Sequence, residues 1–188
     1  ILARLKYDGG IMTPDKFLPL IAQFNLSARF DLQVLESLLK WLATHPCDKK
    51  GPRFSVNLMP LTLLQKNIAG RIIRLFKRYH ISPQAVILEI TEEQAFSNAE
   101  SSMYNIEQLH KFGFRIAIDD FGTGYSSIGY LRRFNFDTIK IDKSLAGLVD
   151  HDEQAAALVS GTVRIANALG MAVVAEGVET ERQMKLLR

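Results

Sequence analysis

The sequence has one cysteine and no long run of apolar residues, and both absences restrict what the protein can be. Cys47 has no second cysteine to pair with, so an internal disulfide is excluded. A lone thiol suits a reducing compartment, and we expect a cytoplasmic domain. No Cys/His cluster accompanies Cys47, so a zinc site there is not expected. No uninterrupted apolar segment approaches the length that spans a bilayer.

The chain also lacks blocks of one charge. It carries 23 basic and 20 acidic residues, and its longest basic runs are the pairs Lys49-Lys50 and Arg132-Arg133. Scattered charge gives little support to binding of a nucleic-acid polymer, whereas a small anionic ligand remains compatible. A length of 188 residues with 47% hydrophobic residues predicts one globular domain over 1–188.

Short β-rich runs alternate with longer amphipathic runs along the chain. This alternation predicts an α/β fold with right-handed crossovers and a mainly parallel sheet. Strands are expected at 1–5, 53–57, 85–90, 114–118, 138–142 and 172–175. Helices are expected at 14–23, 31–44, 61–79, 97–112, 126–134, 152–169 and 179–188. The pattern leaves two closures open, a doubly wound open sheet and a (β/α) barrel.

Polar side chains stand at the carboxyl ends of five expected strands. They are Asn57, Glu89, the pair Asp119-Asp120, Lys140 and Glu176. A barrel gathers its chemistry at the ends of many strands, whereas an open sheet gathers it at one switch point, so the distribution favours the barrel. Each residue also has an ordinary interpretation, such as a helix cap for Asn57 or a snorkelling surface side chain for Lys140.

These side chains indicate a site for hard divalent cations. Four converging carboxylates repel one another unless cations neutralise them, and the absence of His and Cys among them favours Mg²⁺ or Mn²⁺ over zinc. Four negative charges match two divalent ions, and paired metals roughly 3.5–4 Å apart recur in phosphoester cleavage. Two roles fit Lys140: stabilising the attacking hydroxide or the phosphoryl charge, and acting as a buried counter-ion to Asp120.

Several blocks of sequence resemble a known family. They are ILARL (1–5), GIMTPDKFLPLIAQF (10–24), SVNL (55–58), LEITE (88–92), IDDFGTGYSS (118–127), IKID (139–142) and VVAEGVET (173–180). In this order they resemble the EAL-domain cyclic di-GMP phosphodiesterases over essentially the whole chain. The resemblance implies a modified TIM (β/α)8 barrel whose first strand runs antiparallel to the others. Because fewer than eight strands are expected, the chain would lack the first and last barrel strands, and the signature glutamate would immediately precede Ile1.

The resemblance also implies a reaction and its residues. The reaction is hydrolysis of cyclic di-GMP to linear pGpG with two Mg²⁺ or Mn²⁺ ions, and Ca²⁺ is inhibitory. The positions that match metal ligands are Asn57, Glu89, Asp119, Asp120 and Glu176. Lys140 matches the catalytic lysine, and Asp120 matches the carboxylate that binds the second metal or orients the nucleophilic water.

Four further residues match supporting positions of the family. Glu92 matches the glutamate that fixes the loop 121–126 after the aspartate pair. Arg4 matches the arginine that holds a substrate phosphate, Leu2 the leucine against a guanine, and Glu179 an acidic residue lining the site. The resemblance further implies a homodimer within a parent protein that carries sensor or GGDEF-type domains, with anchoring to the inner membrane left open.

Two other functions fit parts of the sequence. The first is a catalytically inactive cyclic di-GMP receptor or protein-interaction module, as in EAL domains that have lost metal ligands. The intact ligand positions within the chain favour the enzyme. The second is a phospho-accepting response regulator, which the Asp119-Asp120 pair and Lys140 superficially resemble. That fold carries its acidic pair on the first strand rather than the fourth.

Overall fold

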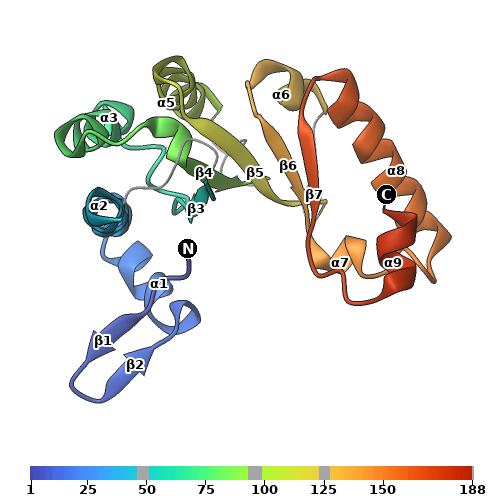
Figure 1. Ribbon diagram of the computed structural model, residues 1–188, viewed down its shortest axis with the longest axis horizontal. Helices are drawn as coiled ribbons and strands as arrows, with labels where there is room; N and C mark the ends of the chain where they lie inside the picture. Colours follow the sequence, from blue (N-terminus) through green and yellow to red (C-terminus); the bar gives the residue numbers. More distant parts are fainter. Residues whose placement is uncertain (46–50, 93–98, 123–127, 188) are drawn as a thin grey trace.

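A computed structural model describes residues 1–45, 51–92, 99–122 and 128–187 of the chain. Figure 1 shows a curved sheet with helices around its outside. The strands of this parallel sheet are β3 (Phe54–Asn57), β4 (Val86–Thr91), β5 (Arg115–Phe121), β6 (Thr138–Ile141) and β7 (Ala172–Ala175). The predictions for Cys47 and for most of the loop 121–126 fall outside the described residues.

The order of the strands decides between the two closures. Neighbours in the sheet follow the chain, β3-β4-β5-β6-β7, and every pair is parallel. A doubly wound sheet reverses its strand order at a switch point, and this sheet does not. The arrangement therefore confirms the barrel-type α/β fold, of which the described strands form an open arc.

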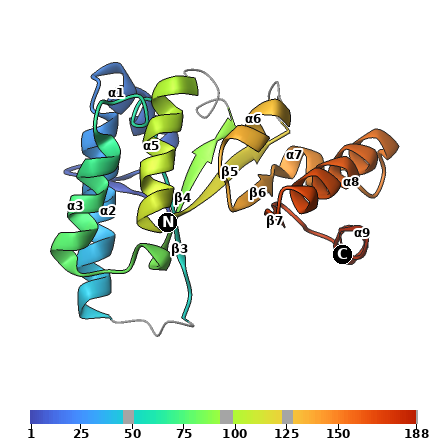
Figure 2. The same cartoon turned by 90° about the horizontal axis from the view of Figure 1, so that it is seen from above.

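The helices follow the strands much as the periodicity predicts. They are α1 (Pro14–Gln23), α2 (Ser27–Thr44), α3 (Ile68–Tyr79), α5 (Ala99–Phe112), α6 (Ile128–Arg133), α7 (Lys143–Ala146), α8 (Glu153–Ala168), α9 (Glu181–Leu186) and the 3₁₀ turn Pro83–Ala85. Seen from above, α2, α3 and α5 run side by side (Figure 2). Within the described ranges, no helix combines the length and apolar character needed to cross a membrane.

The prediction of a strand over 1–5 is wrong. The first strand is β1 (Leu5–Tyr7), which pairs antiparallel with β2 (Gly10–Met12) in a separate two-stranded sheet. Tyr7 pairs with Gly10, which has a φ of 126°, so a two-residue turn closes the hairpin. Residues 1–4 instead run beside the main sheet, where the amino terminus donates a hydrogen bond to the Ser55 carbonyl.

The prediction that a helix begins at 61 is also wrong. Turns occupy 60–67, and α3 begins only after Asn67, whose φ of 61° is left-handed. The reason lies in Asn105 of α5, whose side-chain amide donates to the carbonyls of Leu63 and Gln65 and accepts from the amide of Ala69. These bonds replace the helical ones that the local pattern predicts.

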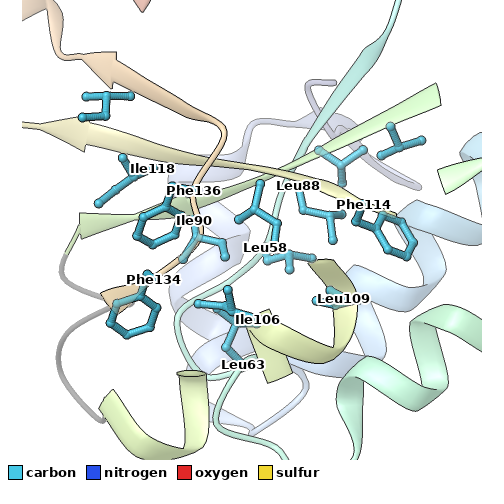
Figure 3. Close-up of a cluster of buried hydrophobic side chains, with 14 of the residues drawn as sticks. Leu58, Leu63, Leu88, Ile90, Ile106, Leu109, Phe114, Ile118, Phe134 and Phe136 are labelled. Atoms are coloured by element: carbon cyan, nitrogen blue, oxygen red, sulfur yellow. The ribbon is translucent and has the colours of Figure 1, made fainter. Parts of the chain in front are cut away.

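The face of the sheet toward the helices forms the hydrophobic core. Leu88, Ile90 and Ile118 from the strands are fully buried against Ile106 and Leu109 of α5 (Figure 3). Burying each large aliphatic side chain stabilises the fold by about 1.5–3 kcal/mol. Because side chains alternate along a strand, the residues between these core positions point to the opposite face.

Candidate active site

The register of the parallel strands places the candidate polar residues on the face opposite the core. Asn57 pairs with Glu89, and Glu89 pairs with Ala117, so Asp119 lies two residues further along the same face. Ala117 pairs with Thr138, which puts Lys140 on that face too. Lys140 pairs with Val174, and Glu176 follows two residues later. The polar face is therefore a consequence of strand register.

Lys140 lies at the centre of this group. Its Nζ is 2.7 Å from a Glu176 oxygen, 2.8 Å from Asp119 Oδ1 and 3.1 Å from Glu89 Oε1. The side chains of Glu89 and Asp119 are 8% and 11% exposed, whereas that of Glu176 is 39% exposed. Glu89 on β4, Asp119 on β5 and Glu176, the residue after β7, thus share one ammonium.

Asn57 completes the group from β3. With its amide nitrogen turned toward the acids, it donates to Asp119 Oδ2 at 3.2 Å and to Glu89 Oε2 at 3.1 Å. Its main chain is tied to β4 as well, because the amide of Leu58 donates to the Glu89 carbonyl. Asn57, Glu89 and Asp119 are therefore in direct contact through their side chains.

The aspartate pair lies inside β5, which runs on to Phe121 rather than ending at 118 as expected. Between Ile118 and Phe121 the strand has one residue more than β6, which makes a β-bulge. Asp120 occupies the bulge with a left-handed φ of 55°. A regular strand would point Asp119 and Asp120 to opposite faces, but here both border the same cleft.

The charges of the cluster act on one another. Burial raises the pKa of Asp120, and the charges of Asp119, Asp142 and Glu176 raise it further, while Lys140 opposes them. Burial lowers the pKa of Lys140, but its hydrogen bonds to Asp119 and Glu176 and the charge of Glu89 outweigh this and raise it above its ordinary value. The cluster therefore favours a positive charge at its centre.

A cleft of about 630 Å³ borders the cluster. Asn57, Asp119 and Asp120 line its acidic end, and Leu2 lines its apolar part, where α1 and α2 supply further walls. Leu2 is 76% exposed, so the cleft leaves most of this side chain accessible. An apolar wall beside a polar end suits an organic ligand with an ionic group.

Of the remaining predicted residues, Glu92 lies near the aspartate pair, whereas Arg4 and Glu179 do not contact the cluster. Glu92 is buried, and its Oε2 accepts a hydrogen bond at 3.2 Å from the amide of Gly122, two residues after Asp120. Arg4 is exposed, and its guanidinium donates to the adjacent carbonyl of Ala3 at 2.8 Å. Glu179 is exposed in the connection between β7 and α9. The structure does not bring Arg4 or Glu179 into contact with the acidic cluster.

Two acidic residues near the site were not predicted to belong to it. Asp142 ends the IKID block and accepts from the amide of Ser144 at 2.8 Å, and its charge reaches Asp120. Asp31 of α2 lines the cleft, although it is only 1% exposed. Its one available signal is its place in the apolar stripe of the helix, four residues before Leu35.

The donor set fits a hard divalent cation. Glu89, Asp119, Asp120, Glu176 and Asn57 offer carboxylate and amide oxygens, which Mg²⁺ and Mn²⁺ prefer. Among the residues that the structure describes, no group of three acidic, histidine or cysteine side chains has the spacing to hold a metal ion, and three of the carboxylates instead pair with the Lys140 ammonium. The space between these carboxylates therefore attracts cations, as the position of the Lys140 ammonium shows.

Comparisons with known proteins agree with this geometry. A family model described as "EAL domain" matches residues 1–188. The chain is 78% identical over 187 residues to "Probable cyclic di-GMP phosphodiesterase PdeA" of Escherichia coli and spans 26% of that protein's length. The solved "PaMucR Phosphodiesterase, c-di-GMP complex" is 35% identical with a TM-score of 0.87, covering 99% of this chain and 76% of that one.

A second solved structure is similar at lower identity. It is the "Klebsiella pneumoniae BlrP1 pH 8.0 calcium/cy-diGMP complex", which is 28% identical with a TM-score of 0.81. The match covers 99% of this chain and 50% of that one. With its parallel strand order, its acidic face and a family match over residues 1–188, the chain belongs to the EAL domain family.

Proposed function

We propose that this chain is the catalytic domain of a metal-dependent phosphodiesterase that hydrolyses one phosphodiester bond of cyclic di-GMP to linear pGpG. The observation that supports it most directly is the cluster itself. Carboxylates from or directly after three strands lie within 3.1 Å of one ammonium, beside a cleft that can hold a ligand. Similarity to PdeA, described as a probable cyclic di-GMP phosphodiesterase, and to MucR and BlrP1, solved in complex with cyclic di-GMP, supports the choice of substrate.

The metal ligands in this proposal are the oxygen donors of the cluster. Glu89, Asp119 and Glu176 already surround a cation, and Asp120 lies at the same cleft. Asn57 joins them when its amide turns to present oxygen instead of nitrogen. When bound there, two Mg²⁺ or Mn²⁺ ions would supply Lewis acidity and lower the pKa of a coordinated water.

The protein's own groups have separate tasks. Lys140 holds a positive charge where negative charge develops on the phosphoryl group, and its raised pKa keeps it protonated. Asp120 has a raised pKa and faces the cleft, so it is placed to accept a hydrogen bond from the attacking water. Glu92 fixes the backbone that follows the aspartate pair through its bond to Gly122.

Substrate contacts are proposed along the cleft. Leu2 offers an apolar surface to a guanine base. Arg4 reaches a phosphate only after it leaves the Ala3 carbonyl, and Glu179 contributes only if its loop approaches the cluster. Both therefore stay predictions that require movement on substrate binding. Calcium is expected to inhibit because it binds the same oxygens with a looser geometry.

The experiment is turnover of cyclic di-GMP by the full-length protein, with pGpG separated by chromatography. We expect turnover with Mg²⁺ or Mn²⁺, and loss of at least about a hundredfold for Glu89→Gln or Lys140→Ala. A matched control is Glu107→Gln on α5, whose side chain is 46% exposed and pairs only at the surface with Lys111. Equal loss in the control, or full activity in Glu89→Gln, would show that the roles are wrong.

The alternative of a non-catalytic receptor makes a different prediction. A receptor would bind cyclic di-GMP without releasing pGpG, and Mg²⁺ would not change that result. Calorimetric binding beside the turnover assay separates the two functions. A homodimer and additional domains in the parent protein belong to the same proposal, and sedimentation of the full-length protein tests the dimer.

A further inference from the structure

A buried carboxylate outside the acidic cluster holds the segment that follows Asn57. Asp31 of α2 is 1% exposed, and its Oδ2 accepts hydrogen bonds from the amide of Met59, at 2.7 Å, and from the hydroxyl of Thr62. Both partners lie 28 or more residues away in sequence, in the connection between β3 and α3. A single oxygen of one helix thus joins two points of this connection.

Two anchors hold the backbone directly after Asn57 as a result. The amide of Leu58 donates to the Glu89 carbonyl at 2.9 Å, and the amide of the next residue, Met59, donates to Asp31. Asn57 is exposed at the carboxyl end of β3, so contacts with neighbouring side chains in the core do not fix the orientation of its side chain. Its hydrogen bonds to Glu89 and Asp119 therefore depend on where the backbone at 57–59 places it.

The arrangement around Asp31 is costly. Its second oxygen, Oδ1, and the hydroxyl of Ser27, one helical turn earlier, are both buried without a hydrogen-bond partner among the described residues. A buried polar group left without a hydrogen bond destabilises the folded state. Burial also raises the pKa of Asp31 to about 6, against the two hydrogen bonds that lower it. An apolar residue in this stripe of α2 would be the simpler choice for stability alone.

We infer that Asp31 is a positioning residue, which holds the backbone after β3 so that Asn57 presents its amide to the metal site. This inference rests on the proposed function, because it assumes that Asn57 is a metal ligand. Partners that orient metal ligands from behind typically change metal affinity by about 10- to 100-fold when removed. Asp31 acts here through the main chain rather than by touching the ligand.

The test compares Asp31→Ala, Asp31→Asn and a matched control in the full-length protein. Asparagine keeps an oxygen that accepts from Met59 and Thr62, so it should rescue the alanine variant. The control is Asp152→Ala, which also removes a carboxylate that accepts two hydrogen bonds, at the start of α8 and away from the site. A general loss of stability would affect this control in the same way.

Two measurements separate the inference from the proposed function. Mn²⁺ affinity is measured by titration without substrate, and backbone exchange over 57–63 is measured by deuterium uptake. We expect Asp31→Ala to weaken Mn²⁺ binding about tenfold or more and to speed this exchange, with Asp31→Asn within about threefold of the native protein. Turnover should fall through kcat with little change in KM.

The outcomes are distinguishable. If Asp31→Ala leaves both Mn²⁺ affinity and exchange unchanged while the native protein is active, the inference is wrong and the proposed function stands. If Asp152→Ala weakens Mn²⁺ binding equally, Asp31 has only a structural role. If the native protein binds no Mn²⁺ and releases no pGpG, the proposed function fails first, whatever the exchange data show.

Discussion

Replacing Lys140 with methionine removes the ammonium from among its three carboxylates while keeping a side chain of similar length. The native contacts of 2.7, 2.8 and 3.1 Å are charge-assisted, and the Lys140 side chain is 13% exposed. Removing one partner of a buried ion pair costs about 3–5 kcal/mol, because the other charge stays behind uncompensated. Since Glu176 is partly exposed, we expect the lower end, about 3 kcal/mol, when no divalent metal is present.

The same variant should respond to metal more strongly than the native protein. Without the ammonium, Glu89, Asp119 and Glu176 lack the cation that offsets their mutual repulsion. A ligand at a hundred times its Kd stabilises the folded state by about 2.7 kcal/mol, so saturating Mg²⁺ should recover most of the loss. In the native protein the ammonium already neutralises part of the charge, so the gain there should be smaller.

The assay is urea unfolding of the full-length protein in EDTA and in Mg²⁺, followed by deuterium uptake in peptides from β4, β5 and β6. Lys111→Met is the control, because this exposed lysine pairs with Glu107 at 3.6 Å and its removal should cost at most about 0.5 kcal/mol. Native-like stability of Lys140→Met in EDTA would refute the claim that the ammonium holds the cluster together. A loss that Mg²⁺ does not recover would refute the metal site.

Three further predictions follow from buried or strained residues. Burial raises the pKa of Asp31 from 3.8 to about 6, so the native state keeps a proton that the unfolded state loses. Stability should therefore fall by about 3 kcal/mol as the pH rises through that window, and Asp31→Asn should abolish this part of the difference between unfolding at pH 4 and pH 7. Asp120 has a φ of 55°, so Asp120→Ala should unfold about 1 kcal/mol more easily than Asp120→Gly, which adopts this conformation freely, and a less stable glycine variant in thermal unfolding would contradict the strain. Phe76 is fully buried with its ring 4.6 Å from Phe114, so Phe76→Ala should cost about 3–5 kcal/mol in urea unfolding, while Tyr104→Ala, at a residue that is 62% exposed, should cost far less.

The alternating pattern of the sequence predicts most of the fold, because each strand and helix carries its own periodicity. The last strand matches its prediction at both ends, 172–175. The failures occur where a distant residue decides the local structure. Asn105 takes the carbonyls that a helix over 61–67 would have used, and no pattern within that segment reports a side chain 40 residues away. At the start of the chain, the turn before Gly10 favours a hairpin over a strand of the main sheet.

The site was partly predictable for the same reason. Strand ends in a parallel sheet share one edge, so the meeting of Lys140 with Glu89, Asp119 and Glu176 follows from the positions of the strands. The bulge at Asp120 depends on how β5 aligns with β6, which the sequence of β5 does not state. Asp31 was missed because a polar residue can interrupt the apolar stripe of a helix for several reasons. The sequence of the helix does not show whether such a residue is exposed or is buried with hydrogen-bond partners from another segment.

The stagger of the strands explains why residues at different heights meet at one ammonium. Glu89, Ala117, Thr138 and Ala172 form one row of paired residues across the sheet. Measured from this row, Lys140 lies two residues further along its strand and Glu176 lies four residues further, about 13 Å at 3.3 Å per residue. In a flat sheet whose strands did not tilt, these side chains would lie too far apart along the strand direction to reach one ammonium. They reach it because barrel strands tilt and stagger, which brings successively later residues to the same level of the axis. The cluster therefore depends on the register of β4 to β7 as a whole. A slip of one residue in any of these strands would turn its polar side chain toward the hydrophobic core between the sheet and the helices.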